Sequence, residues 1–382
     1  MNILLLSPYH GGSHRAWSEG YKRYSQEHVE LLTMPARFWK WRMHGGAITV
    51  ARRFLERFED SESSWPDAIV ATDMLDLTTF VALTRVHCAS IPLVLYMHEN
   101  QLTYPLPHDP STGPMRRQRG ERDLHYTFIN LASMLAADRV VFNSQYHHDS
   151  LVEALPAYLK RFPEFNELGT LNSLREKSSV LPVGIDGPRL SAQRPPTDTG
   201  AKQDAPLILW NQRWEYDKDP ASFFNALYKV QEEGISFRLA LCGESFSQAP
   251  TEFEEATSRL QGCLVHVGYA PAEKYRELLW SADIVISTAR HEFFGISIVE
   301  AVYCRTFPIL PARLSYPELL PQEFHGHCLY ESDDALVSHL RWALQNLDQT
   351  NALSRKLAPA MERFSWELLA PQYDAFFHTV LP

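Results

Sequence analysis

The chain has 382 residues, of which 45% are hydrophobic and 21% charged, values that exclude an intrinsically disordered protein and favour two globular domains. It has no apolar run of about eighteen residues and no basic secretory start, so we expect neither a membrane span nor a signal peptide. The five cysteines form no C-x-x-C pair and the net charge is −10, which argues against a disulfide framework, a zinc ribbon and a general polyanion binder and favours a cytoplasmic protein.

Short apolar runs alternate with amphipathic stretches along the first half of the chain. We expect strands within NILLLSPY, VELLTMP, AIVATD, PLVLYMHEN, RVVFNS and SSVLPVG. Near-continuous apolar runs are typical of parallel strands that are buried on both faces. The pattern therefore predicts an α/β domain with a doubly wound sheet over residues 1–186.

The first predicted strand leads into YHGGSHRAW, in which Gly11 and Gly12 would let the backbone approach a ligand closely. This stretch does not have the G-x-G-x-x-G spacing of dinucleotide-binding proteins, and alone it is a weak signal. A later predicted strand ends in His98, Glu99 and Asn100. A histidine there can be structural, or it can face a ligand at the carboxyl end of the strand.

The segment MPARFWKWRMHGG, residues 34–46, places three cations among three aromatic side chains, which is unusual in an acidic protein. Two interpretations remain open from the residues alone. The tryptophans can belong to the core while the cations are solvated, or the segment can offer stacking faces and phosphate contacts to RNA. The segment MRRQRGERDLHY, residues 115–126, adds further arginines.

Residues 187–206 are rich in proline and in small or polar side chains without apolar periodicity, which predicts a linker. The second half repeats the strand and helix alternation, so we expect a second Rossmann-like domain over residues 207–360. Residues 361–382 predict an amphipathic helix that packs back on the first domain. The second-half strands are expected within PLILWNQR, FRLALCGES, LVHVGY, DIVISTAR and TFPILPA.

Two groups of charged residues follow strands of this second domain. Arg213 and Lys218 come after LILW, where two cations would suit a diphosphate. In HEFFGISIVEA, Glu292 and Glu300 flank Gly295, at the point where a loop enters a helix whose N-terminus could receive a phosphate. Taken alone, each group could equally consist of solvated residues on the surface.

Taken in order, R-x4-K at Arg213 and Lys218, E-x7-E at Glu292 and Glu300, the glycine loop and His98 resemble the retaining glycosyltransferases of the GT-B fold, family 4. The strings GGSH, PARFWKWR, HENQLTYP, ERDLHYTFIN and VVFNS resemble more specifically the tRNA-queuosine α-mannosyltransferases. The resemblance implies an α/β GT-B fold, with two Rossmann-like doubly wound parallel-sheet domains facing across a cleft. It also implies a GDP-mannose donor and a queuosine-containing tRNA as partner, without a membrane.

The resemblance assigns roles to particular residues. Arg213, Lys218, Glu292 and His98 would form the catalytic set, with Glu292 positioning the sugar during front-face attack rather than acting as a nucleophile. No cofactor would be needed, and no metal if Arg213 and Lys218 carry the charge stabilisation. The donor-binding residues would be Gly11, Gly12, Asn211, Phe294, Gly295, Ile296 and Glu300.

The acceptor tRNA would contact the first domain at His14, Arg37, Trp39, Lys40, Trp41, Arg42, Asn100, Arg122 and Asp123. Two alternatives remain open. The first is a family 4 transferase that uses another nucleotide sugar and a lipid, glycan or small-molecule acceptor. The second is a non-catalytic tRNA-binding protein on a transferase scaffold.

Overall fold

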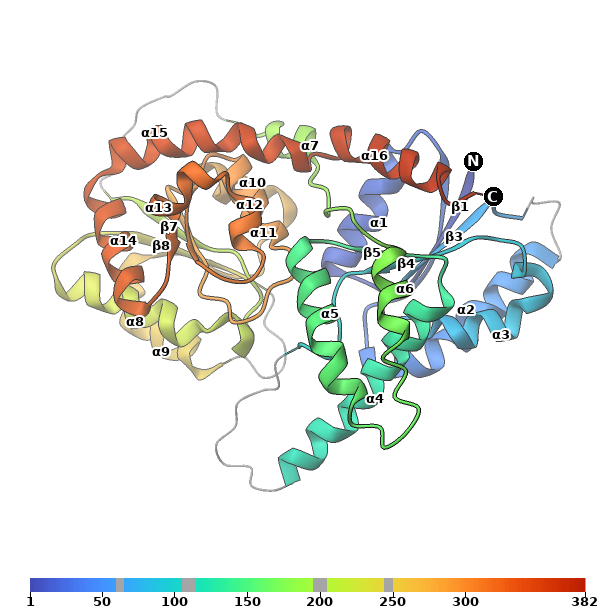
Figure 1. Ribbon diagram of the computed structural model, residues 1–382. Coiled ribbons are helices and arrows are strands. Elements are labelled where there is room, and N and C mark those ends of the chain that lie inside the picture. Colours follow the sequence, from blue (N-terminus) through green and yellow to red (C-terminus); the bar gives the residue numbers. More distant parts are fainter. Residues whose placement is uncertain (60–64, 105–114, 195–204, 244–249, 382) are drawn as a thin grey trace. The chain divides into compact units, whose positions relative to one another are not determined.

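The computed structural model describes residues 1–59, 65–104, 115–194, 205–243 and 250–381, with no side chains described for 59 and 115–124. The described chain divides into two compact units (Figure 1). Unit 1 consists of Met1–Gly184 and Trp366–Pro382, and unit 2 of Ile185–Ser365.

Unit 1 is built on a six-stranded parallel sheet with the order β2-β1-β3-β4-β5-β6. Its strands are β1 (Asn2–His10), β2 (His28–Pro35), β3 (Ala68–Thr72), β4 (Leu93–Met97), β5 (Arg139–Phe142) and β6 (Ser178–Val180). Its helices are α1 (Gly12–Tyr24), α2 (Trp39–Glu59), α3 (Leu77–Cys88), α4 (Met115–Ala136), α5 (Gln145–Leu159), α6 (Thr170–Glu176) and α16 (Trp366–His378).

Unit 2 has a second six-stranded parallel sheet, with the order β12-β11-β10-β7-β8-β9. Its strands are β7 (Leu207–Trp210), β8 (Arg238–Cys242), β9 (Leu264–Gly268), β10 (Ile284–Ile286), β11 (Phe307–Pro311) and β12 (Leu329–Tyr330). Its helices are α7 (Gly187–Ser191), α8 (Pro220–Glu232), α9 (Thr251–Arg259), α10 (Ala272–Ser281), α11 (Ile296–Tyr303), α12 (Tyr316–Leu319), α13 (His325–Cys328), α14 (Asp333–Gln345) and α15 (Leu347–Leu357), with short 3-10 helices η1 (Tyr216–Lys218), η2 (Gln261–Cys263), η3 (Gln322–Phe324) and η4 (Ala358–Phe364).

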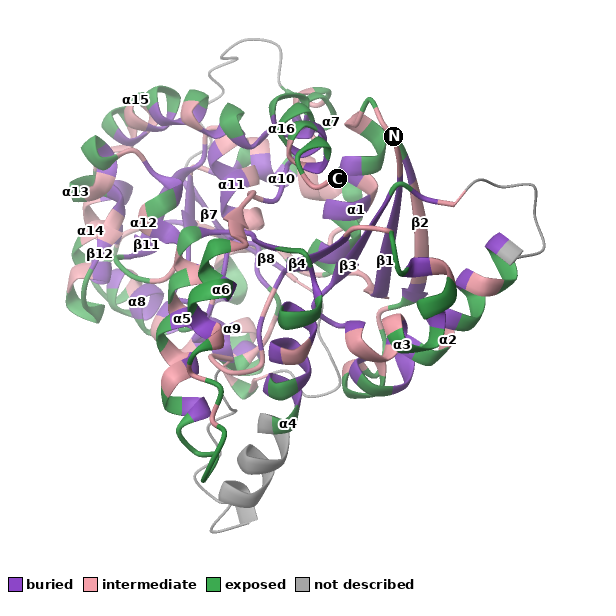
Figure 2. Cartoon of the chain, turned by 45° about the vertical axis from the view of Figure 1, so that its right-hand side comes forward, coloured by how far each residue is buried: buried purple, intermediate pink, exposed green. Residues whose placement is uncertain are grey.

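Both sheets are covered by helices, and the inner strands β3 and β4 are buried along their whole length (Figure 2). This burial explains why these strands read as unbroken apolar runs in the sequence. The edge strand β9 differs, because Val265 and Val267 are more than two-fifths exposed. In each sheet the strand order reverses beside the first strand, between β1 and β3 and between β7 and β10, and ligands of such sheets bind at the carboxyl ends there.

The structure differs from the sequence predictions at the junctions between segments. Gly187–Ser191, expected as part of a linker, forms helix α7, because the Asp186 side chain caps it by accepting the N–H of Arg189. Residues 195–204 lie outside the described residues. The second unit extends to Ser365, beyond the expected residue 360, because η4 packs against α11. The two-residue strand β12 was not predicted, since so short a run has no periodicity.

Helix α16 packs on α1 of unit 1. The Trp366 ring lies over Gly20 and Gly184, where an added Cβ would come within 2.0 and 2.3 Å of it. The buried Asp374 carboxylate accepts hydrogen bonds from the Tyr21 hydroxyl at 2.7 Å and from the N–H of Gln26 at 2.9 Å. The end of the chain is therefore fixed to the first helix by both packing and hydrogen bonds.

Candidate active site

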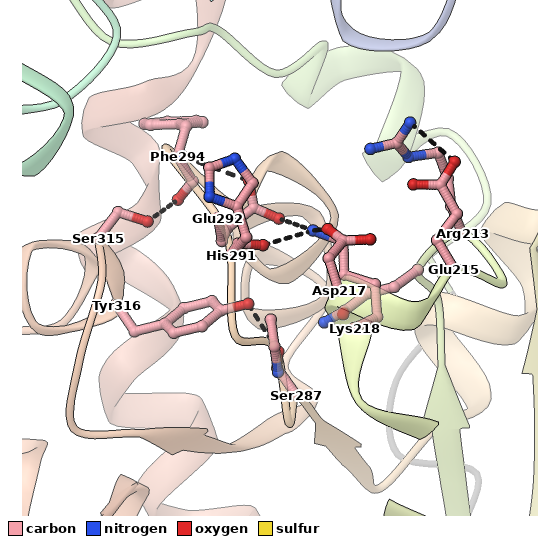
Figure 3. A network of polar contacts seen from close by, with 12 residues as sticks. Arg213, Glu215, Asp217, Lys218, Ser287, His291, Glu292, Phe294, Ser315 and Tyr316 are labelled. Atoms are coloured by element: carbon pink, nitrogen blue, oxygen red, sulfur yellow. Dashed lines mark hydrogen bonds and ion pairs between the residues drawn. The ribbon is translucent and has the colours of Figure 1, made fainter. Parts of the chain in front are cut away.

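The loop after β7 holds a buried cation at the switch point of the unit 2 sheet. Lys218 is 5% exposed, and its ammonium donates to the carbonyl oxygen of His291 at 2.7 Å and to the Glu292 carboxylate at 3.2 Å (Figure 3). The Asp217 carboxylate lies 3.2 Å from the same nitrogen. Burial acts to lower the pKa of Lys218, but the two carboxylates outweigh it and the pKa is raised. The lysine is therefore ionised and fixed in place.

Glu292 is held from two sides. Its carboxylate receives the Lys218 ammonium and, through the other oxygen, the N–H of Phe294 at 3.3 Å. Burial acts to raise its pKa, but Lys218 and the remaining partners outweigh this effect and lower it. Glu292 is therefore a fixed anion at neutral pH. It can accept hydrogen bonds from hydroxyl groups but cannot donate a proton.

Gly295 follows directly and has a φ of +94°, in the left-handed region that favours glycine. It is the N-cap of α11, so the N–H groups of Ile296 and Ser297 precede the first hydrogen bond of the helix, which Ile298 donates to the Gly295 carbonyl oxygen. A helix N-terminus beside a buried lysine is suited to a phosphate group.

Arg213 lies in the same loop as Lys218 but has a different environment. Its side chain is 48% exposed, and its guanidinium contacts Glu215 at 3.3 Å (Figure 3). It thus offers a solvated cation near the pair formed by the buried Lys218 and the half-buried Glu292. Such a group can turn toward a charged ligand at little cost in packing.

Glu300 lies one helical turn further along α11, next to the end of β7. Its carboxylate accepts a hydrogen bond from the Tyr275 hydroxyl at 2.9 Å. Burial raises the pKa of Glu300 to about 7, although Tyr275 and Arg189 act against this. Asn211, at the end of β7, donates to the carbonyl oxygen of Ser297 at 2.7 Å and to the Tyr275 hydroxyl at 3.3 Å.

Sequence reasoning missed Tyr275 and Asp217 as members of this site. Tyr275 lies within a predicted helix, where nothing in the local pattern distinguishes it from a packing residue. Asp217 had a signal that could have been used, because it stands directly before the lysine in the motif. Within the described ranges, no three histidine, cysteine, aspartate or glutamate side chains gather as a metal site.

His98 directly follows β4, at the carboxyl edge of the unit 1 sheet. It is 6% exposed, its ring lies 4.0 Å from that of His14, and neither ring nitrogen has a hydrogen-bond partner among the described residues. Burial and the neighbouring His14 and His147 hold the pKa of His98 well below its usual range, so the ring is neutral. A neutral imidazole with both nitrogens available can donate to or accept from a ligand hydroxyl.

The backbone of His98 is clamped on both sides. Its N–H donates to the Asp73 carboxylate at 2.9 Å, and its carbonyl oxygen accepts from the Asn143 amide at 2.9 Å. Asp73 was not predicted, although it follows a buried strand as His98 does. Asn100 is fully buried and accepts from the N–H of Thr103 at 2.9 Å, while its amide nitrogen has no partner among the described residues.

The glycine loop lies at the same edge of the unit 1 sheet, after β1. Gly12 has a φ of +52° and open space where a Cβ would lie. At Gly11 an added Cβ would approach the Cβ of Ala36 to 2.4 Å. Gly11 therefore allows the loop before α2 to pack directly on the glycine loop.

The cationic and aromatic segment begins α2, and the structure separates its two tryptophans. Trp39 packs against Tyr126 of α4 with ring centroids 5.1 Å apart, and the Lys40 ammonium lies 5.3 Å from the Trp39 ring. Trp41 is 61% exposed. The two predicted acceptor segments therefore meet at the start of α2, where one tryptophan packs and the other is solvated.

The remaining residues predicted to contact the acceptor lie around this point. The Arg42 guanidinium donates to the carbonyl oxygen of Pro35, and Arg37 is exposed. Arg122 and Asp123 lie in α4, but their side chains are outside the described residues. None of the described helices is long and apolar enough to span a bilayer.

Known proteins show the same domain arrangement along the sequence. Residues 2–185 match the family described as tRNA-queuosine alpha-mannosyltransferase N-terminal, and residues 193–358 match the family described as Glycosyl transferases group 1. The chain is 32% identical to the tRNA-queuosine alpha-mannosyltransferase of Drosophila melanogaster, over 99% of this chain and 96% of that protein. It is 21% identical to the GDP-mannose:cellobiosyl-diphosphopolyprenol alpha-mannosyltransferase of Xanthomonas oryzae, over 68% of this chain and 63% of that protein.

Solved structures agree with this at the level of the fold. Sucrose-phosphate synthase from Thermosynechococcus elongatus has a TM-score of 0.69 at 16% identity, covering 100% of this chain and 99% of that one. Anabaena HepE in complex with UDP and glucose has a TM-score of 0.66 at 16% identity, covering 99% of each chain. The two parallel sheets and the group 1 match define a glycosyltransferase of the GT-B fold. Within that class, the chain belongs to the tRNA-queuosine alpha-mannosyltransferase family.

Proposed function

We propose that this protein transfers mannose from GDP-mannose to the queuosine at the wobble position of a tRNA anticodon, with retention of the α configuration. The observation that carries the proposal is the 32% identity to the Drosophila tRNA-queuosine alpha-mannosyltransferase over nearly the whole of both chains. A cytoplasmic location accords with a tRNA substrate.

The choice of GDP-mannose as donor has support of its own. The names of two more distant relatives, from Xanthomonas oryzae and Mycobacterium tuberculosis, include GDP-mannose. Both relatives are 21% identical to this chain, over 68% and 81% of its length. GDP-mannose is therefore the first donor to test, with UDP-glucose as the comparison.

In the proposed reaction, an acceptor hydroxyl oxygen bonds to C1 of mannose while the bond from C1 to the leaving phosphate oxygen breaks. The hydroxyl proton passes to that phosphate oxygen, so the products are the mannosylated nucleoside and GDP. No metal is needed if Arg213, Lys218 and the N-terminus of α11, at Phe294, Gly295 and Ile296, stabilise the negative charge of the diphosphate. The pairing of Lys218 with Glu292 supports this arrangement.

The carboxylates and the unit 1 residues would bind the sugar and the nucleoside. Glu292, kept ionised by Lys218, would accept hydrogen bonds from the hydroxyl groups of mannose. Glu300 would accept hydrogen bonds from the ribose hydroxyl groups, with Asn211 beside it. His98, the neutral imidazole, would bind the sugar from unit 1, while Gly11 and Gly12 would admit the phosphates. The predicted acceptor residues, from His14 and Asn100 to the segment Arg37–Arg42, would contact the tRNA.

The test is direct mass analysis. The protein is incubated with GDP-mannose or UDP-glucose and with queuosine-containing or queuosine-lacking tRNA, and the tRNA is then digested to nucleosides. We expect one added hexose on queuosine with GDP-mannose only. A Glu292→Gln variant should bind GDP but transfer little mannose. Absence of hexose on queuosine with the wild-type protein would reject the proposal.

A further inference from the structure

Phe38, directly before α2, has an unusual combination of exposure and backbone conformation. Its side chain is 79% exposed, and its φ is +53°, in the left-handed region that favours glycine. Its carbonyl oxygen accepts the N–H groups of Trp41 at 2.8 Å and Arg42 at 3.1 Å, which starts the helix. The fold needs the turn at this position, but a glycine would make that turn with less strain.

The turn lies at the carboxyl edge of the unit 1 sheet, because it connects β2 to α2. The preceding Ala36 packs on Gly11, and Pro8 of β1 lies beside Gly46 of α2, where an added Cβ would be 3.4 Å from the Pro8 Cβ. Phe38 therefore lies two residues after the residue that packs on the glycine loop of the candidate site.

The surface around Phe38 contains a second exposed aromatic ring and several cations. The Trp41 ring packs on Gly45, where an added Cβ would lie 2.5 Å from it, and the residue as a whole is 61% exposed. Arg37 and Lys40 are exposed on the same turn of chain. Exposed aromatic faces beside cations are the chemistry that binds unpaired nucleobases and their phosphates.

We propose that the Phe38 ring stacks on an unpaired base of the anticodon loop and so orients the modified nucleoside toward the glycine loop and His98. This inference rests on the proposed function, since it assigns the tRNA contact of the same site to a particular side chain. The cations on this turn favour a nucleic acid as the occupant over an apolar partner. The contact of the side chain with RNA would then explain why a residue other than glycine stands at φ +53°, despite its conformational cost.

The chain offers a matched control in Phe165. This phenylalanine is 84% exposed and also has a positive φ, of +48°. It lies in the connection from α5 to α6, at the amino edge of the sheet, because α5 runs back from the carboxyl end of β5. Phe165 therefore shares the residue type, exposure and backbone conformation of Phe38 but not its position.

The experiment measures binding of a queuosine-containing anticodon stem-loop RNA, and separately mannose transfer, for Phe38→Gly, Phe38→Tyr and Phe165→Gly. Loss of the ring in Phe38→Gly should weaken RNA binding roughly 5- to 100-fold and raise KM for tRNA, although glycine suits the turn. Phe38→Tyr should stay within about twofold of the wild type, and so should Phe165→Gly. Binding of GDP-mannose should be the same in all four proteins.

Phe38→Gly binding the RNA as tightly as Phe165→Gly would overturn the inference, and so would a wild-type protein that binds no stem-loop RNA. The proposed function fails separately, when the wild-type protein binds the RNA but adds no hexose to queuosine. A Phe38→Gly variant that is less stable to urea than the wild type would show that the ring has a packing role instead.

Discussion

The two glutamates of α11 and its preceding loop differ in their ionisation, although they come from one sequence motif. Burial raises the pKa of Glu300 to about 7, whereas the Lys218 ammonium overcomes burial and lowers that of Glu292. A carboxylate that accepts two ribose hydroxyls must be ionised. The affinity for the nucleotide should therefore fall as the pH is lowered through about 7. Below that pH Glu300 is protonated in the free protein and must lose its proton before the nucleotide binds.

This pH dependence is measured by calorimetric titration of GDP between pH 5.5 and 8.5. The wild-type protein should lose close to tenfold in affinity for each pH unit below about 7. Glu300→Gln should bind GDP more weakly at pH 8 and show a flatter profile. Glu292→Gln is the control, since it should keep the wild-type slope. An unchanged slope in Glu300→Gln would assign the titration to another group.

The two cations after β7 differ in burial, which separates their contributions to stability and to catalysis. Removing the Lys218 ammonium in Lys218→Met leaves Asp217 and Glu292 without their cation. This should lower the free energy of unfolding by about 3–5 kcal/mol as well as mannose transfer. Arg213→Ala removes an exposed cation and should stay within about 0.5 kcal/mol of the wild type, while transfer falls roughly 100-fold.

Urea denaturation and the rate of transfer at saturating tRNA measure the two effects. If Arg213→Ala proved as destabilising as Lys218→Met, its role would be structural. Full transfer in a folded Arg213→Ala protein would remove Arg213 from the catalytic set.

At the scale of single elements, the sequence predicted the inner strands and the C-terminal helix because their burial patterns are local. The apolar runs at β3, β4, β7, β10 and β11 follow directly from burial on both faces. Contacts between distant segments could not be predicted in this way. The hydrogen bond between Tyr275 and Glu300 and the packing of Trp39 on Tyr126 depend on how helices meet, which no periodicity encodes.

Helix α16 is joined to α1 by buried polar contacts whose loss should be measurable. The Asp374 carboxylate accepts from the Tyr21 hydroxyl, the Ser25 hydroxyl at 2.5 Å and the N–H of Gln26. Asp374→Ala would leave these donors without their acceptor and should lower the free energy of unfolding of unit 1 by about 2–3 kcal/mol. Gln372→Ala is the control, because Gln372 is exposed on the same helix and bonds only within it among the contacts described.

Urea denaturation followed by tryptophan fluorescence measures this change, with Trp17 and Trp366 fully buried in unit 1 and Trp210 in unit 2, and the transition that Asp374→Ala shifts is that of unit 1. Equal midpoints for Asp374→Ala and Gln372→Ala would mean that packing of Trp366 alone holds the helix.

At the scale of the whole molecule, the two units differ in how the chain forms them. Unit 2 is one continuous segment, Ile185–Ser365, and its ends pair with each other, since the N–H of Ile185 donates to the carbonyl oxygen of Phe364 at 2.8 Å. Unit 1 is discontinuous, because it needs Trp366–Pro382 to complete it. A continuous domain whose ends are adjacent is the kind that folds alone.

We therefore expect residues 185–365, expressed alone, to unfold cooperatively and to bind GDP, since Lys218, Glu292 and Glu300 are all within them. Residues 1–184 alone should not fold stably, because Trp17 and Tyr21 would lose their buried contacts with Tyr373 and Asp374. Joining Trp366–His378 to residue 184 through a flexible linker should restore folding, as measured by circular dichroism and thermal melting. A stable fold of residues 1–184 without α16 would show that the helix is an addition to unit 1 rather than part of its core. Failure of residues 185–365 to bind GDP despite folding would indicate that the nucleotide site needs residues of unit 1.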